Sequence, residues 1–166
     1  GARLRALRGN DHRRGVFELL AQLTSAPAVD ERTWRAQFDA MRAAHAHYIV
    51  LAVARGAGDD ERVVALATLF VERKLLRACA AVGHIEDVVV DASCRGRGYG
   101  RLLVGALVRI AFTLRAANVY KVMLDCEPDK APFYAKAANF VAKDAHMTLY
   151  RPKPHDGGGD TDDAAA

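Results

Sequence analysis

The sequence is poor in cysteine and has no long apolar run. Its three cysteines are widely spaced and form no Cys-x-x-Cys pair, which argues against a disulfide framework or zinc site and for a reducing compartment. No apolar stretch approaches the roughly 20 residues that a helix needs to span a bilayer. The longest candidate, Leu102 to Leu114, is interrupted by Arg109. We therefore expect no metal and no contact with a membrane.

The net charge is also small, at +4 over 166 residues. Acidic residues are interspersed with basic ones, and exposed aromatics do not alternate with them, which argues against nucleic-acid binding. The small excess of positive charge is compatible with a small anionic substrate. We expect a cytoplasmic location, with a microbody as the alternative. The terminal Ala-Ala-Ala is not a recognised targeting signal, and a signal upstream of Gly1 would not be visible.

In the first half of the chain, residue spacing predicts a strand, two helices and a β-hairpin. The strand covers residues 3–7 and the helices begin at Asp11 and Asp30, each a candidate N-cap, with the first helix ending near Leu23. The hairpin joins residues 48–54 to 63–72 through a glycine- and aspartate-rich turn at 56–60.

In the second half, strands alternate with helices. We predict a loop over 74–84, strands over 85–90, 119–126 and 146–150, and helices over 99–116 and 129–137. This order indicates one α/β domain, residues 1–151, with a mixed sheet flanked by helices. Residues 152–166 contain prolines, consecutive glycines and acidic residues, and are predicted to be a disordered tail.

The most informative motif is a glycine-rich turn between a predicted strand and a predicted helix: Arg95, Gly96, Arg97, Gly98, Tyr99 and Gly100. Glycines let a ligand approach the backbone, and the first amides of a helix have no internal partner, so the turn predicts a phosphate or pyrophosphate site. A P-loop is excluded because Gly100 is not followed by Lys-Ser/Thr. The dinucleotide fingerprint is excluded because the glycines fall at every second position.

Arg95-x-x-Gly98-x-Gly100 resembles the signature of the GNAT acetyltransferase superfamily. The flanking segments Gly83 to Val90, Tyr120 to Cys126 and Phe133-Tyr134 are similar to the glucosamine-6-phosphate N-acetyltransferases within it. The resemblance covers about residues 3 to 151. It implies a GNAT fold with a mostly antiparallel sheet, acetyl-CoA as cosubstrate with its pyrophosphate on the turn, and glucosamine 6-phosphate as acceptor for UDP-GlcNAc biosynthesis.

The resemblance also assigns roles to residues of the strand before the turn. It implies that Glu86, Asp87 and the backbone of Val88 bind the sugar, and that backbone amides around Val88 and Val90 hold the thioester carbonyl. Adjacent residues of a strand point to opposite faces, so from the residues alone a bulge or a solvated strand end is the alternative explanation for two neighbouring acids.

The same resemblance implies that Asp125 is the general base, acting directly or through a water. Partial burial would raise its pKa toward a useful range. Tyr134 matches the tyrosine that protonates or stabilises the departing thiolate; without the resemblance, Phe133-Tyr134 would be assigned to the core. We expect direct transfer in a ternary complex, with Cys126 a buried thiol and not a nucleophile.

A phosphate site and a homodimer are implied as well. Lys74 and Arg77 would bind the phosphate of the sugar, helped by Thr24 and by a C-terminal arginine of the second subunit. Arg151 is our assignment for that arginine, although Tyr150 occupies the equivalent position when residues are counted from Met147. Tyr120 and Lys121 would line the site across the dimer.

Two departures from the family and three alternative functions stay open. Lys130 replaces an expected asparagine, and the segment near Asn139 is one residue longer than usual, where Asn139 would take the left-handed conformation of a glycine. The alternatives are a GNAT enzyme acting on another amine, a non-catalytic acyl-CoA-binding module, and a basic nucleic-acid-binding domain.

Overall fold

The computed structural model describes residues 2–55, 61–143 and 147–150. Its centre is a five-stranded sheet in the order β1-β2-β3-β4-β5. The pairs β1–β2, β2–β3 and β3–β4 are antiparallel, and the pair β4–β5 is parallel. The strands are β1 (Arg3–Ala6), β2 (His47–Arg55), β3 (Glu61–Arg73), β4 (Ala81–Val90) and β5 (Val119–Met123). The predicted mixed sheet and the β2–β3 hairpin are confirmed; the predicted turn at 56–60 lies outside the described residues.

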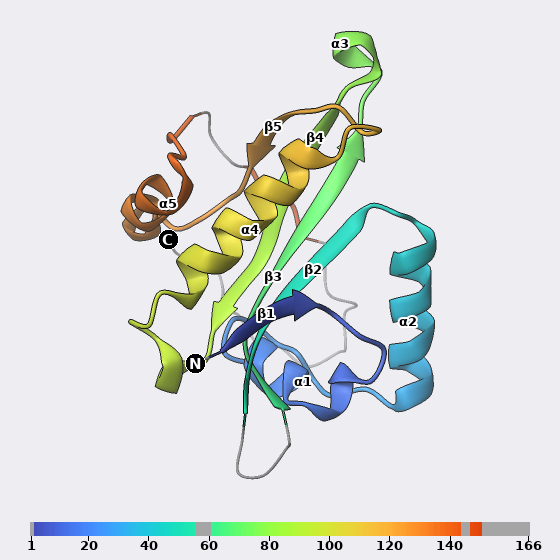
Figure 1. Ribbon diagram of the computed structural model, residues 1–166, viewed down its shortest axis with the longest axis vertical. Helices are drawn as coiled ribbons and strands as arrows, with labels where there is room; N and C mark the ends of the chain where they lie inside the picture. Colours follow the sequence, from blue (N-terminus) through green and yellow to red (C-terminus); the bar gives the residue numbers. More distant parts are fainter. Residues whose placement is uncertain (1, 56–60, 144–146, 151–166) are drawn as a thin grey trace, which may run out of the picture.

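One face of the sheet is covered by α4 (Tyr99–Thr113), which connects the parallel strands β4 and β5. Its buried side chains recur at helical spacing and pack on the sheet: Leu103, Val104, Leu107 and Ala111. The shorter α5 (Ala131–Ala138) lies beside α4 (Figure 1). Asn139 ends α5 in the left-handed conformation (φ 57°), as the sequence predicted.

The opposite face packs against α1 (Val16–Leu20), through Val16 and Leu19. The helix α2 (Glu31–Ala43) begins where predicted, because the Asp30 side chain accepts a hydrogen bond from the Thr33 amide at 2.7 Å. Trp34 links α2 to the chain before α1, because its indole nitrogen donates a hydrogen bond of 2.8 Å to the Gly9 carbonyl.

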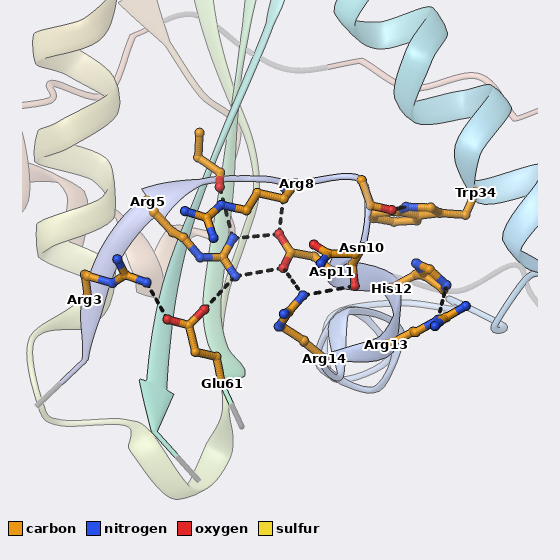
Figure 2. Close-up of polar contacts among 12 residues, drawn as sticks. Arg3, Arg5, Arg8, Asn10, Asp11, His12, Arg13, Arg14, Trp34 and Glu61 are labelled. Carbon is orange, nitrogen blue, oxygen red and sulfur yellow. Dashed lines mark hydrogen bonds and ion pairs between the residues drawn. The ribbon is translucent and has the colours of Figure 1, made fainter. Parts of the chain in front are cut away.

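The prediction of one helix from Asp11 to Leu23 is wrong. The segment forms a 3₁₀ turn (Asp11–Arg13) and then α1, separated by Gly15 in the left-handed conformation (φ 82°), which no continuing α-helix permits. Asp11 is not a side-chain cap. It is fully buried, and its carboxylate accepts paired hydrogen bonds from Arg5 at 2.7 and 2.8 Å and one from the Arg8 amide at 2.7 Å (Figure 2).

Two predictions near the ends of the sheet also need correction. The expected loop over 74–84 contains the short helix α3 (Leu76–Cys79), and β4 begins four residues earlier than predicted, at Ala81 and not at Ile85. The last predicted strand is wrong for residues 147–150, which form no strand. Met147 and Leu149 are 92% and 97% exposed, so these apolar side chains have no sheet to pack against within one chain. No helix in the described part of the chain has the length and apolar character needed to cross a membrane.

We expect the Asp11→Asn substitution to lower the free energy of unfolding by about 3 kcal/mol, because it removes the closer of the two carboxylates that pair with the Arg5 guanidinium and leaves only Glu61, at 3.3 Å. Burial alone would raise the pKa of Asp11, but the hydrogen bonds from Arg5 and Arg8 outweigh it and hold the pKa below its usual value. The contribution of the pair is therefore complete above about pH 4 and is lost as the pH falls further.

Urea unfolding at neutral and acidic pH measures both effects. Glu31→Gln, which removes an exposed partner of Arg13, is the matched control and should change stability little. A loss for Asp11→Asn no larger than that of the control would contradict this account.

Candidate active site

The glycine-rich turn forms the strand-to-helix connection that the sequence predicted. After β4 a 3₁₀ turn (Ala92–Cys94) leads to Arg95, and Gly98 immediately precedes the first residue of α4. Gly96 and Gly98 have φ angles of 77° and 81°, in the left-handed region where a side chain costs about 1–2 kcal/mol. A β-carbon at either glycine would meet no atom within 4 Å, so the backbone conformation, and not crowding, requires glycine here.

The turn presents backbone amides and positive charge to solvent. The first amides of α4 have no partner within the helix, and the helix dipole adds partial positive charge at the same end. Arg95, Arg97 and Arg101 are exposed around it. Behind the turn Gly100 is buried, and a methyl group there would come within 3.1 Å of the Phe133 ring. This arrangement fits an extended anion such as a pyrophosphate.

The strand leading to the turn contains a β-bulge at the predicted acids. Leu66 pairs with Val89 and Thr68 with Glu86, so one residue of β3 lies opposite both Asp87 and Val88. Asp87 has a φ of 54°, and its carboxylate accepts a hydrogen bond of 3.4 Å from the Thr68 hydroxyl. The bulge interrupts the simple alternation expected from the sequence, and both acids are exposed.

The edge of β4 that faces away from β3 has two parts. Residues from Ala81 to His84 pair with β5, and the last of these pairs joins His84 to Met123. Residues 85–90 continue to the end of β4 without a β5 partner. The predicted backbone contacts at Val88 and Val90 therefore belong to a stretch that, among the described strands, pairs with β3 alone, on the opposite edge.

Asp125 follows the end of β5 and is exposed. The partial burial expected from the sequence is therefore not found in the single chain. Cys126 is also exposed, which corrects the expectation of a buried thiol. In the parallel register, Asp125 and Glu86 each lie two residues beyond the final pair of His84 with Met123.

The helix α5 connects the glycine turn to the Asp125 segment. Phe133 packs against Gly100 at the start of α4, while Tyr134 lies near Cys126. Burial, with a smaller contribution from the Cys126 thiol, raises the pKa of Tyr134 above its usual value. The Phe140 ring packs edge-on against Tyr134, with the ring centres 6.3 Å apart. Tyr134 therefore keeps its proton at neutral pH.

Two of the predicted phosphate ligands, Lys74 and Arg77, lie in and beside α3, at the other end of the sheet from the glycine turn (Figure 1). Lys74 pairs with Glu72, whose second carboxylate oxygen is 3.0 Å from His84 Nε2. The Arg77 guanidinium lies 4.7 Å above the centre of the Tyr120 ring, so two predicted ligands come together.

The remaining predicted ligands are less constrained. Lys121, like Tyr120, is exposed on the edge strand β5, and Thr24 is exposed just after α1. Arg151 lies outside the described residues, so its proposed role stays a prediction. Sequence reasoning missed Asp91, the residue after β4, and the two side chains that donate to its carboxylate, Gln22 and Arg62. A buried acid at the end of a strand was the only available signal.

Comparison with known proteins agrees with this geometry. Residues 13–140 match the acetyltransferase (GNAT) family, and the chain belongs to that family. It is 42% identical over 147 residues to a protein of Oryza sativa subsp. japonica described as probable glucosamine 6-phosphate N-acetyltransferase 2, covering 89% of this chain and 86% of that one.

A solved relative gives the same family and fold. The crystal structure of glucosamine-6-phosphate N-acetyltransferase from Arabidopsis thaliana is 32% identical, has a TM-score of 0.82, and is matched over 90% of this chain and 98% of that one. Within the GNAT family, the chain is thus a homologue of the glucosamine 6-phosphate N-acetyltransferases.

We predict that the Tyr134→Phe protein lacks the phenol whose ionisation midpoint lies above about pH 10, because burial disfavours the phenolate. Ultraviolet difference titration against the unsubstituted protein isolates that single ionisation. A missing step centred below pH 10 would contradict the burial of this phenol in the folded protein.

Proposed function

We propose that this chain transfers the acetyl group of acetyl-CoA to the 2-amine of glucosamine 6-phosphate, giving N-acetylglucosamine 6-phosphate for UDP-GlcNAc biosynthesis. The observation that carries the proposal is the position of α5. Two neighbouring side chains, Phe133 and Tyr134, contact the glycine turn and approach the segment after Asp125, so one rigid element spans the sites proposed for donor and acceptor. The names of the relatives supply the acceptor.

In this proposal the glycine turn and the free length of β4 bind the donor. The amides at residues 96–100 would hold the pyrophosphate. The backbone beyond His84 has no β5 partner and would lie along the thioester arm. An amide near Val88 would donate to the thioester oxygen and stabilise the negative charge that develops there, which typically contributes about 3–4 kcal/mol.

The acceptor would lie at the bulge. Glu86 and Asp87 are exposed carboxylates. In this proposal they would accept hydrogen bonds from the hydroxyl and ammonium groups of the sugar. Lys74 and Arg77 would pair with the phosphate, giving up the ion pair with Glu72 and the cation–π contact with Tyr120 for charge-assisted hydrogen bonds to the phosphate oxygens.

The chemistry needs one base and one acid. The sugar ammonium loses a proton to Asp125, directly or through a water, and the free amine attacks the thioester carbon. The tetrahedral intermediate then collapses and the carbon–sulfur bond breaks. The leaving thiolate takes a proton from Tyr134, and the second proton of the sugar nitrogen returns through solvent to the Tyr134 phenolate, so that the neutral amide, free coenzyme A and the phenol result. No acyl-cysteine forms, so Cys126 has no covalent role.

We also propose that the active form is a homodimer. Support comes from exposed apolar side chains at the β5 edge and the C-terminal segment: Tyr120, Met123, Met147, Leu149 and Tyr150. A second copy would cover them and supply Arg151 to the phosphate. Sedimentation as a monomer at concentrations where the enzyme is fully active would contradict this.

The acceptor assignment predicts that kcat/KM for glucosamine 6-phosphate exceeds that for glucosamine by at least about 100-fold, because two charge-assisted contacts are each worth about 1.5–3 kcal/mol. Lys74→Ala should reduce this ratio about tenfold by slowing only the phosphorylated substrate. Arg32→Ala, which removes an exposed cation of α2, should leave the ratio unchanged. Equal rates with glucosamine or with a peptide amine would overturn the assignment.

The base assignment predicts that Asp125→Asn lowers kcat by about 10²–10³-fold, because the amide cannot accept the proton. Coenzyme A affinity, measured by isothermal titration calorimetry, should stay within about twofold of the original. If the unsubstituted protein binds coenzyme A but acetylates no amine, it is a binding module and the proposed function fails.

A further inference from the structure

The first residue after β4 is a buried acid with an unusually complete set of hydrogen-bond donors. Asp91 is 4% exposed, and its carboxylate accepts hydrogen bonds from Gln22 Nε2 at 3.1 Å, from Arg62 Nη2 at 2.9 Å and from the Ser93 amide at 3.0 Å. The Ser93 hydroxyl is a fourth donor. A buried carboxylate is costly unless it is paired in this way, so the contacts fix its position.

Gln22 makes the link reciprocal. While its amide nitrogen donates to Asp91, its carbonyl oxygen accepts from the Ala92 amide at 2.9 Å. The Gln22 side chain therefore hydrogen-bonds to two consecutive residues, Asp91 and Ala92, where β4 ends. Gln22 follows α1 and lies two residues before Thr24, so it ties the end of α1 to the start of the connection that becomes the glycine turn.

The glycine turn needs such external support, because it has little packing of its own. Around Gly96 and Gly98 there is open space where side chains would be, and both residues are exposed. The turn is therefore held at its two ends. The C-terminal end is fixed by Gly100 against Phe133. The N-terminal end follows the 3₁₀ turn, whose Cys94 amide donates to the Asp91 carbonyl at 2.8 Å.

We propose that Gln22 and Asp91 are positioning residues that hold the amides of the glycine turn in the geometry needed for the donor, and that they couple this turn to the segment carrying Thr24. The inference rests on the proposed function, since it assumes that coenzyme A binds at the turn. The pair does not touch the reacting atoms. It acts by keeping several amides aligned before the pyrophosphate arrives, so that binding does not have to order them.

Gln22→Ala and Asp91→Asn test this directly. Each should weaken coenzyme A binding in calorimetry, and raise the KM for acetyl-CoA, by about tenfold, the effect of losing one hydrogen bond to a charged group. At saturating donor, kcat should stay within about twofold, because the acid and the base are unchanged. Gln37→Ala and Asp39→Asn, at exposed positions of α2, are the matched controls and should bind coenzyme A normally.

The double variant distinguishes a pair from two independent contributors. If the two residues act through one contact, Gln22→Ala/Asp91→Asn should weaken coenzyme A binding no more than the stronger single change. Gln22→Glu should be worse than Gln22→Ala, because it places a second carboxylate against Asp91. Coupling to Thr24 predicts that Gln22→Ala also raises the KM for glucosamine 6-phosphate about threefold, a smaller loss than that of one full hydrogen bond.

Three results would overturn the inference while leaving the proposed function intact: single variants that bind coenzyme A as tightly as the original, fully additive losses, or a fall in kcat without a rise in KM for acetyl-CoA. Failure of the unsubstituted protein to bind coenzyme A would instead refute the proposed function. Thermal unfolding of each variant shows that the proteins compared are folded.

Discussion

The arrangement of this protein depends on the two different edges of β4. On one edge β4 pairs with β3 from Ala81 to Val90, interrupted only by the bulge. On the other, the pairing with β5 stops at His84. Extended backbone that lacks a neighbouring strand offers a row of donors and acceptors, and such an edge is well suited to bind an extended ligand. The bulge, the valines and the glycine turn all lie on this second half of β4 or directly after it.

Because β4 is the common element, the rest of the fold serves to hold it from several sides. The helix α4 packs its apolar side chains on one face of the sheet, and α1 packs on the other. Polar contacts fix the same elements at their ends. Arg5 and Asp11 join β1 to the turn before α1, and Gln22 joins the end of α1 to Asp91. The glycine turn, which has little packing of its own, is in this way held by contacts to two buried carboxylates, Asp11 and Asp91.

Local rules made some of these features predictable from the sequence. The glycine turn, the cap at Asp30 and the left-handed Asn139 each follow from the conformational preference of one residue and its neighbours. Features that depend on distant partners were not predictable. Asp11 looks like a helix cap until Arg5 is seen beside it, and nothing in the order of residues shows that Gln22 reaches Asp91.

The same distinction explains the two errors at the ends of the site. Apolar alternation over residues 147–150 predicts a strand, but a strand needs a neighbour, and these side chains are exposed in the single chain. For Asp125, an apolar strand predicted partial burial, whereas β5 ends at Met123 and the acid beyond it is exposed. In both cases the missing information is what lies beside the segment.

The central claim is that the glycine turn and the free length of β4 together bind coenzyme A. The most direct measurement is the change in backbone amide chemical shifts when coenzyme A is added to isotope-labelled protein. The account predicts that the largest changes occur at residues 88–90 and 96–100, with smaller ones at Ala92 and Gln22. Changes confined to other surfaces, with these amides unaffected at saturating coenzyme A, would contradict it.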